Sequence, residues 1–254
     1  MKIAVVTGAS SGMGREFVKA IDRDYGHILD EIWVLARRKE RLEELAEQVE
    51  IPLRIFAVDL LKEDEYEEYL QALKNYNPKV GILVNSSGFG MIGNFTEITR
   101  DVNLSMVDLN CRVLTKVTYD TLGFMNKGAR IVNLASSAAF VPQPKFAVYA
   151  ASKSYVLSFS KALRCELKER GIGVTAVCPG PVKTEFFDIA EENSQVALYK
   201  KLVMADPVKV VNKAMEDMKM GVSKSVYGYL MQAFDVLTKL LPHDIILSIM
   251  TRIK

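Results

Sequence analysis

Short apolar runs alternate along this chain with longer segments of helical periodicity, and this alternation constrains the fold more than any other feature. The runs are dense in Val, Ile and Leu, which is typical of strands covered on both faces of a sheet. Segments such as RKERLEELAEQVE and EDEYEEYLQALKNY have the spacing of helices. We therefore expect strands at Ile3–Thr7, Ile32–Ala36, Leu53–Val58, Gly81–Val84, Arg130–Leu134 and Val174–Cys178, with a last one near Ser225–Tyr227.

A strand–helix–strand alternation of this kind predicts a parallel sheet with right-handed crossovers. We expect an α/β chain with a doubly wound Rossmann fold, a mainly parallel sheet of about seven strands and additional C-terminal helices. The 254 residues suffice for one sizeable core. Because no linker, repeat or low-complexity segment interrupts them, we expect a single domain over residues 1–254. Within it, residues 186–220 are expected to form a substrate lid and residues 229–254 a helical C-terminal extension.

Composition and charge argue against several classes of function. The 33 basic and 31 acidic residues nearly balance, so no strong field attracts nucleic acid. Three cysteines without a CxxC pair and only two histidines argue against a disulfide framework, a metal site or Ser-His-Asp chemistry. The N-terminal MKIAVVTG is too short an apolar run for a signal peptide, and no run reaches the roughly 18 apolar residues of a spanning helix. We expect a cytoplasmic protein.

A glycine-rich loop, TGASSGMG, joins the first expected strand to the first helix. Its glycines permit a tight turn and a close approach of the backbone to a diphosphate, which then meets the helix N-terminus. A bare structural turn would not need three glycines at this spacing, and the strand–loop–helix context is typical of dinucleotide binding. The candidate cofactor-binding residues in this loop are Gly8, Ser10, Ser11, Gly12, Met13 and Gly14.

The end of the second strand bears on which dinucleotide binds. A fold that prefers NAD usually carries a carboxylate there for the ribose 2′-hydroxyl, whereas this chain continues with Arg37 and Arg38. A guanidinium fork matches a 2′-phosphate, which favours NADP(H). Alternatively, both arginines are solvated charges that open the next helix, as we expect of Lys39 and Arg41. Arg37 is the preferred candidate because it lies nearer the strand end.

The third strand ends in Val58-Asp59-Leu60. An acidic residue at this position can reach the adenine edge of a dinucleotide, but it can equally cap the following helix. Both interpretations stand at this point.

The most informative stretch is YAASK, in which Tyr149 and Lys153 project from one face of a helix. A free tyrosine has a pKa of about 10, and a neighbouring ammonium lowers that pKa and makes the phenol a usable general acid/base. Alone, a YxxxK pattern usually means a half-buried aromatic beside a surface lysine. The preceding strand, however, ends in NLASS at the sheet edge where such folds place their sites. A serine hydroxyl there could hydrogen-bond a substrate oxygen.

In this order and context the motifs resemble those of the short-chain dehydrogenase/reductase family, over roughly residues 1–190. The resemblance rests on TGASSGMG, NSSG, a helix bearing Asn110, the serine strand, YAASK and CPGPVKT. It implies that Tyr149 is the general acid/base and that Lys153 holds the nicotinamide ribose and lowers the tyrosine pKa. Ser136, 13 residues before Tyr149, would polarise the carbonyl. Asn110 matches an asparagine that bends a helix and holds a proton-relay water, whereas Asn103, in the similar DVNL, lies too far upstream.

The resemblance also implies further cofactor contacts. Asp59 matches the adenine contact, Asn85 the cofactor-side strand end, and Pro179, Gly180 and Thr184 the segment along the nicotinamide carboxamide. The added cofactor-binding candidates are Asp59, Leu60, Asn85, Gly88, Pro179, Gly180, Val182 and Thr184.

Two features depart from the family pattern. NSSG replaces the usual NNAG, which leaves the role of Ser86 open. The chain also lacks the glycine-rich final strand that builds a tetramer interface in many bacterial members. We nevertheless expect a homo-oligomer, either a dimer or a tetramer.

The last fifth of the chain reads as two apolar amphipathic helices broken at Pro242, with Lys239, Arg252 and Lys254 on the polar side. We expect these helices to cover the substrate cleft or a subunit interface. An alternative is weak membrane association through an apolar face edged by basic residues. The surrounding methionines would suit an adaptable apolar pocket, although packing in a core is the ordinary role of methionine.

The leading hypothesis is an NADP(H)-dependent oxidoreductase that interconverts a carbonyl and an alcohol on a hydrophobic substrate, such as a steroid, an acyl chain or a small ketone. A second hypothesis is a catalytically silent NADP-binding regulatory or interaction protein on the same scaffold. A third is a membrane-associated lipid reductase. The intact set of Asn110, Ser136, Tyr149 and Lys153 favours an enzyme.

Overall fold

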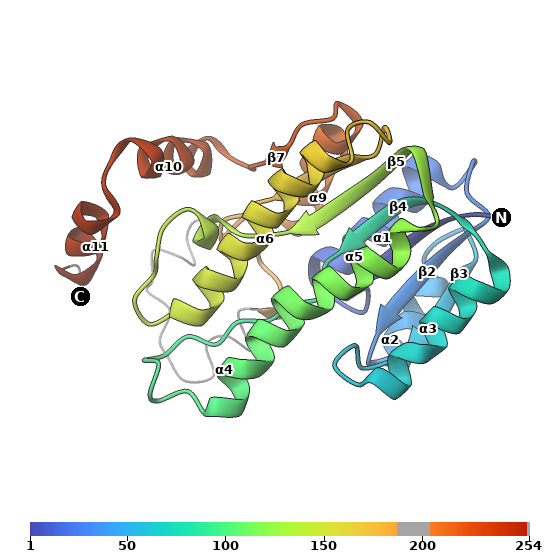
Figure 1. The fold of residues 1–254 in the computed structure, drawn as a ribbon, viewed down its shortest axis with the longest axis horizontal. Coiled ribbons are helices and arrows are strands. Elements are labelled where there is room, and N and C mark those ends of the chain that lie inside the picture. The colour runs from blue at the N-terminus through green and yellow to red at the C-terminus, as the bar shows by residue number, and fades with distance from the viewer. Residues whose placement is uncertain (187–203, 253–254) are drawn as a thin grey trace.

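A computed structural model describes residues 1–186 and 204–252 (Figure 1). All the expected strands form, and they make one parallel sheet of seven strands in the order β3-β2-β1-β4-β5-β6-β7. The strand order reverses between β1 and β4, where a doubly wound fold opens its binding crevice. The strands are β1 Lys2–Thr7, β2 Glu31–Ala36, β3 Leu53–Ala57, β4 Lys79–Asn85, β5 Met125–Leu134, β6 Gly173–Val177 and β7 Lys224–Ser225.

Helices follow most of the strands and cover both faces of the sheet (Figure 1). Two short irregular turns, η1 and η2, lie next to the carboxyl ends of β4 and β5. The helical elements are α1 Gly12–Tyr25, α2 Lys39–Ala46, α3 Glu63–Tyr76, α4 Arg100–Val107, the π-helical turn η1 Asp108–Val113, α5 Leu114–Leu122, the 3-10 turn η2 Ser137–Ala139, α6 Ala147–Glu166, α9 Pro207–Lys219, α10 Tyr229–Leu240 and α11 His243–Arg252.

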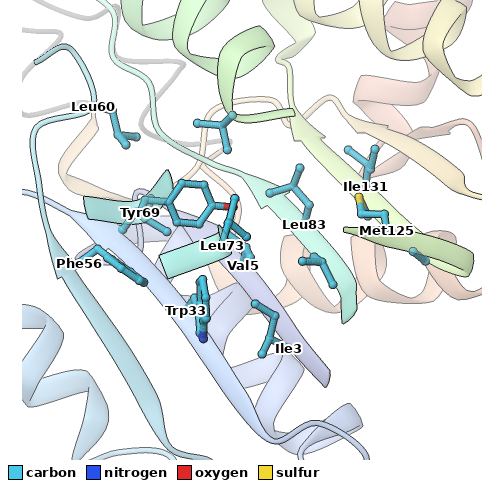
Figure 2. Close-up of a cluster of buried hydrophobic side chains, with 14 of the residues drawn as sticks. Ile3, Val5, Trp33, Phe56, Leu60, Tyr69, Leu73, Leu83, Met125 and Ile131 are labelled. Atoms are coloured by element: carbon cyan, nitrogen blue, oxygen red, sulfur yellow. The ribbon is translucent and has the colours of Figure 1, made fainter. Parts of the chain in front are cut away.

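The core consists of two layers, one on each face of the sheet. Alternate residues of β1 point to opposite sides, so that Val5 joins one cluster and Val6 the other. The first cluster contains Trp33, whose ring meets Tyr69 edge-on at 6.2 Å between centroids (Figure 2). Strands buried on both sides account for the dense Val, Ile and Leu runs in the sequence.

The expected substrate lid, residues 186–220, divides into three parts. Residues 187–203 lie outside the described residues, and Phe186 lies in the large cavity described below. Residues 207–219 form α9, which packs against α1 and buries Val211, Met215 and Met218 in the core. The lid prediction is therefore wrong for α9, because its methionines fill the core as methionines ordinarily do.

The two expected C-terminal helices are present as α10 and α11, separated at Pro242. Asp235 of α10 is buried and forms ion pairs with Lys224 of β7 and Lys239. A Cβ atom on Gly180 would lie 2.6 Å from Sδ of Met231, so α10 packs closely against the segment after β6 at this glycine. Within the described ranges, no helix is both long enough and apolar enough to span a membrane.

Candidate active site

One large cavity, of about 1080 Å³, opens at the carboxyl ends of the strands. Its wall includes the loop after β1, the ends of β2 to β6, the start of α6 and the inner side of α10. The edge of a parallel sheet at its switch point is where doubly wound folds bind their ligands. The cavity thus brings together segments from the two ends of the chain.

The glycine loop forms a backbone cradle at one end of this cavity. Gly8 and Gly12 have φ values of +69° and +52°, which favour glycine. A Cβ atom would lie 2.9 Å from the Ser87 nitrogen at Gly8, and 2.2 Å from the Gly8 oxygen at Gly14. Side chains at these two positions would collide with backbone atoms, so the glycines let the loop fold tightly against the segment after β4 and at the α1 N-terminus. A tight backbone turn at a helix N-terminus fits a diphosphate.

Thr7 holds the turn after β4, where NSSG replaces the family's NNAG. The Thr7 hydroxyl oxygen accepts hydrogen bonds from the Ser86 and Ser87 nitrogens, both at 3.1 Å. These bonds use the backbone of the NSSG segment, so its turn is held whatever side chain follows Asn85.

The two arginines after β2 differ in position. Both line the cavity, but Arg37 is exposed, whereas Arg38 turns toward the glycine loop. Nη2 of Arg38 donates to Oγ of Ser11 at 2.7 Å, and Nη1 lies 2.9 Å from a carboxylate oxygen of Glu185. The structure therefore brings Arg38, and not the preferred Arg37, against the loop.

Asp59 lines the cavity beside Leu60. Its carboxylate accepts a hydrogen bond from the Leu61 nitrogen at 3.0 Å, whereas the residue at the N-cap of α3 is Lys62. Asp59 therefore stabilises its own turn and does not cap the helix. The role of Asp59 as an adenine contact stays a prediction.

The chemical end of the cavity contains Tyr149, Lys153 and Ser136, all buried. Tyr149 and Lys153 lie one turn apart on α6, and Nζ of Lys153 is 5.6 Å from the centre of the tyrosine ring. That Nζ donates to the Leu134 carbonyl oxygen at 2.7 Å, which fixes the ammonium to the end of β5. Ser136 comes two residues after Leu134 and lies on the same wall.

Burial changes the pKa values of both ionisable groups. It raises the pKa of Tyr149 to about 12, and a hydrogen bond with Ser136 acts in the opposite direction. It lowers the pKa of Lys153 to about 8. Desolvation, which penalises the phenolate, is the larger of the two effects on Tyr149. That Lys153 lowers the tyrosine pKa, as expected from the sequence, stays a prediction.

Aromatic side chains surround the phenol. Phe146 stacks on Tyr149 with ring centroids 4.2 Å apart, and Phe186 approaches to 5.4 Å. A Cβ atom on Gly90 would lie 2.7 Å from Cδ2 of Tyr149, so this glycine makes room for the ring. Sequence reasoning missed Phe146 and Gly90. The position of Phe146, three residues before Tyr149 on the same helix face, was the available signal.

Asn110 lies in the π-helical turn η1, where the resemblance implied a bent helix. Its Nδ2 donates to the Phe89 oxygen at 2.9 Å and to Oγ of Ser152 at 3.0 Å. Its Oδ1 accepts from the Phe89 nitrogen at 3.0 Å. Asn110 therefore joins the segment after β4 to α6 from behind the cavity wall.

Two other asparagines lie away from the cavity. Asn85 is buried, and its Nδ2 donates to Thr118 and Asn133, each at 2.9 Å. Asn103 donates to backbone oxygens of residues 95–99 and holds the loop before α4.

The expected residues that line the cavity are Gly8, Ser10, Ser11, Gly12, Met13, Arg37, Arg38, Asp59, Leu60, Gly88, Ser136, Tyr149, Lys153, Pro179, Gly180, Val182 and Thr184. Those that do not line it are Gly14, Asn85 and Asn110. Across residues 1–186 and 204–252, no group of three or more His, Cys, Asp or Glu side chains is placed to hold a metal ion.

Comparisons with known proteins agree with this geometry. The model of a family described as short chain dehydrogenase matches residues 2–195. The chain is 35% identical over 205 residues to sulfoacetaldehyde reductase 2 of Chromohalobacter salexigens, covering 77% of this chain and 78% of that protein. It is 31% identical over 185 residues to an uncharacterised oxidoreductase of Staphylococcus epidermidis, covering 72% and 79% of the two chains.

Solved structures share the fold at lower identity. A short-chain dehydrogenase from Sphingobium yanoikuyae in complex with NADPH superposes with a TM-score of 0.80 at 23% identity, over 100% of this chain and 97% of that one. A short-chain dehydrogenase/reductase from Burkholderia phymatum in complex with NAD gives 0.79 at 21% identity, over 97% and 95%. With the family model and these relatives in agreement, the chain is an oxidoreductase that belongs to the short-chain dehydrogenase/reductase family.

Proposed function

We propose that this chain is an NADP(H)-dependent oxidoreductase that interconverts a carbonyl and an alcohol by hydride transfer on a hydrophobic substrate, with Tyr149 as general acid/base. The observation that carries the proposal is the shared cavity. Tyr149, Ser136 and Lys153 lie in the same space as the glycine cradle. A cofactor held at one end would therefore reach the chemical groups at the other.

The protein groups favour the reductive direction. When bound, a reduced nicotinamide supplies the hydride. Because the pKa of Tyr149 is raised to about 12, its hydroxyl keeps its proton at neutral pH and can donate it to the substrate oxygen. The Ser136 hydroxyl, which lies in the same cavity and acts to lower the pKa of the phenol, is placed to stabilise the charge that develops on that oxygen. Phe146 and Phe186 exclude water from the phenol.

The preference for NADP(H) is supported by the end of β2. The residues at the end of β2 include no carboxylate for a ribose 2′-hydroxyl, and Arg38 there meets Ser11 of the glycine loop. A guanidinium with a neighbouring hydroxyl is a suitable partner for a 2′-phosphate.

The cavity wall opposite the glycine loop supports an apolar substrate. Side chains from several elements contribute to it, namely Phe89, Ile92, Val102, Phe146, Phe186, Leu230, Met231, Phe234, Leu237, Leu241 and Ile246. Burial of apolar surface is the main source of affinity in such pockets. A relative in Neurospora crassa, 30% identical over 220 residues that cover 82% of this chain and 64% of that protein, is named a very-long-chain 3-oxoacyl-CoA reductase.

The test compares NADPH and NADH oxidation against carbonyls graded in size and polarity. We expect a higher kcat/KM with NADPH, increasing as the substrate becomes larger and more apolar. A higher kcat/KM with NADH would contradict the cofactor assignment. Micromolar NADPH binding with no turnover on any carbonyl or alcohol would support the silent regulatory protein instead.

We further propose that residues 1–254 form a single domain that works in the cytoplasm as a homo-oligomer. Its free cysteines, Cys111, Cys165 and Cys178, suit a reducing compartment. Exposed Leu104, Val107, Tyr119 and Tyr155 on α4 to α6 give an apolar surface suited to a second copy. Light scattering on the purified protein at several concentrations measures the oligomeric state, and a monomer at all of these concentrations would contradict the proposal.

Vesicle co-sedimentation tests the alternative of weak membrane association through α10 and α11.

A further inference from the structure

Glu185 links the segment after β6 to the two arginines beside the glycine loop. One of its carboxylate oxygens lies 2.9 Å from Nη1 of Arg38, and the other bonds Nη1 of Arg41. Arg38 also reaches Oγ of Ser11 at 2.7 Å and Oγ of Ser10 at 3.4 Å. A single carboxylate thus spans a site made of two guanidinium groups and two hydroxyls.

This donor set has the chemistry of a phosphate site. Guanidinium groups and hydroxyls both donate hydrogen bonds, and two arginines can contact different oxygens of one phosphate. Hydrogen bonds from Arg41 and Arg38 also hold the pKa of the Glu185 carboxyl below its usual value, so the group is an anion at neutral pH. Arg38 and Glu185 both line the cavity, so the carboxylate lies where a bound nucleotide would enter.

We propose that Glu185 is a specificity-determining residue that competes with the 2′-phosphate of the cofactor for Arg38 and Arg41. The proposal rests on the NADP(H) assignment above and deepens it in two ways. Arg41, expected from the sequence to be a solvated charge, becomes a second ligand of the 2′-phosphate. The Glu185 carboxylate then occupies the phosphate site in the free protein. The 2′-phosphate displaces it, whereas a nucleotide without this phosphate leaves it in place.

Exposure of the three side chains makes this exchange feasible. Arg38, Arg41 and Glu185 are 42%, 38% and 41% exposed, so their ion pairs are in contact with solvent. Exposed pairs contribute little and are readily broken, whereas a dianionic phosphate brings more charge and more acceptor oxygens. The phosphate can therefore displace the carboxylate, at a cost in apparent affinity.

Nucleotide fragments without a nicotinamide test the proposal independently of catalysis. Isothermal titration calorimetry measures the affinity of 2′,5′-ADP and of 5′-AMP for the wild type and for Glu185→Gln, which keeps the shape of the side chain. We expect Glu185→Gln to bind 2′,5′-ADP about fivefold more tightly, equivalent to ~1 kcal/mol. Its affinity for 5′-AMP should change less than about twofold.

Two further variants separate specific contacts from general charge. Arg41→Ala should weaken 2′,5′-ADP by about fivefold and leave 5′-AMP unchanged. Glu40→Gln is the matched control, because Glu40 is an exposed residue of α2 whose replacement removes the same charge beside Arg41. Its effect on 2′,5′-ADP should stay below about twofold, since it lies outside the contacts of Glu185.

The outcomes distinguish this proposal from the cofactor assignment. If the wild type binds 2′,5′-ADP and 5′-AMP with equal affinity, the NADP preference is contradicted and the competition by Glu185 is not. The proposal that Glu185 competes with the phosphate is overturned if Glu185→Gln gains equal affinity for both nucleotides, or gains affinity for neither. A gain in Glu40→Gln as large as in Glu185→Gln also overturns it, because the effect would then be one of net charge.

Discussion

Tyr149 and Lys153 are buried one turn apart on α6, and burial favours the neutral form of each. The pKa of the phenol rises to about 12, while that of the ammonium falls to about 8. At pH 7 the tyrosine is therefore fully protonated and most of the lysine is still charged. In the proposed reaction this proton is the one that Tyr149 donates, and the charged lysine lies beside it.

Replacing Tyr149 with Phe removes the proton donor and keeps the ring that packs against Phe146. We expect kcat to fall by about 10²- to 10⁴-fold, the usual contribution of a general acid, with the Kd for NADPH unchanged. Steady-state kinetics and fluorescence titration measure the two quantities. Tyr155→Phe is the control, because Tyr155 lies on the same helix and its hydroxyl contacts Thr115. Full activity in Tyr149→Phe would refute the assignment.

Lys153 should make the folded protein less stable at neutral pH. Its pKa is lowered from 10.5 to about 8, so below pH 8 the lysine is charged in both states and folding has to desolvate that charge. Above pH 10.5 it is neutral in both states and this cost is absent. The contribution of Lys153 to stability therefore improves as pH rises from about 8 to about 10.5.

Lys153→Met tests this interpretation. The variant removes the cost of desolvating the ammonium, which stabilises the folded protein. It also loses the hydrogen bond to the Leu134 carbonyl, and this loss cancels about 1 to 2 kcal/mol of that gain. At pH 7 we expect Tm to rise by roughly 2–4 °C while turnover is lost. The gain over the wild type should shrink at pH 9.5. A gain in Tm that is the same at both pH values would show that packing, and not charge, is responsible.

Between α4 and α5, the π-helical turn η1 places one asparagine behind the catalytic wall. The amide of Asn110 satisfies both backbone groups of Phe89 and reaches Ser152 on α6. Through these three bonds η1 sets the spacing between the segment after β4 and the helix that carries Tyr149. Asn110 is thus a positioning residue in this structure.

Asn110→Ala leaves the Phe89 nitrogen and oxygen without their partner. An unsatisfied polar group costs about 1–3 kcal/mol when buried, and these two groups are half-buried, so the free energy of unfolding should drop by up to about that amount. Because Phe89 lines the cavity, we also expect kcat/KM to fall at least about tenfold. Asn103→Ala is the matched control, since Asn103 holds backbone oxygens before α4 and lies outside the cavity. It should lose stability in urea denaturation and keep kcat/KM.

The elements differ in how far the sequence could predict them. Buried parallel strands have an unbroken apolar pattern, and each expected strand forms within a few residues of its expected bounds. Residues 207–219 were misjudged because helical spacing shows that one face is apolar and not whether a lid or a core covers that face. Gly90 was missed for a similar reason, since its role depends on Tyr149, which is distant in sequence. Arg41 was expected to be a solvated charge, because its ion-pair partner Glu185 is likewise distant in sequence.

Over the whole molecule, the cavity depends on both ends of the chain. The glycine loop lies within the first 14 residues, while α10 and α11 supply the far wall from Leu230 to Ile246. Figure 1 shows these two helices extending from the sheet beyond β7. The family motifs predict the first part, because a cofactor constrains it. The tail has no such motif, so its position over the cavity could be inferred only as one of three alternatives, beside a subunit interface and a membrane contact.

Neighbouring leucines at the end of α10 separate two of those alternatives, the substrate wall and the membrane contact. Leu241 lines the cavity, whereas Leu240 is 74% exposed and does not. Leu241→Asp places a charge against an apolar substrate, so KM for a large apolar carbonyl should rise at least about tenfold. Leu240→Asp introduces the same charge into solvent and should leave KM unchanged. If the tail instead binds lipid, Leu240→Asp is the variant that reduces co-sedimentation with vesicles, because its side chain is the one that faces outward. Equal KM values for the two variants would mean that α10 does not form the substrate wall.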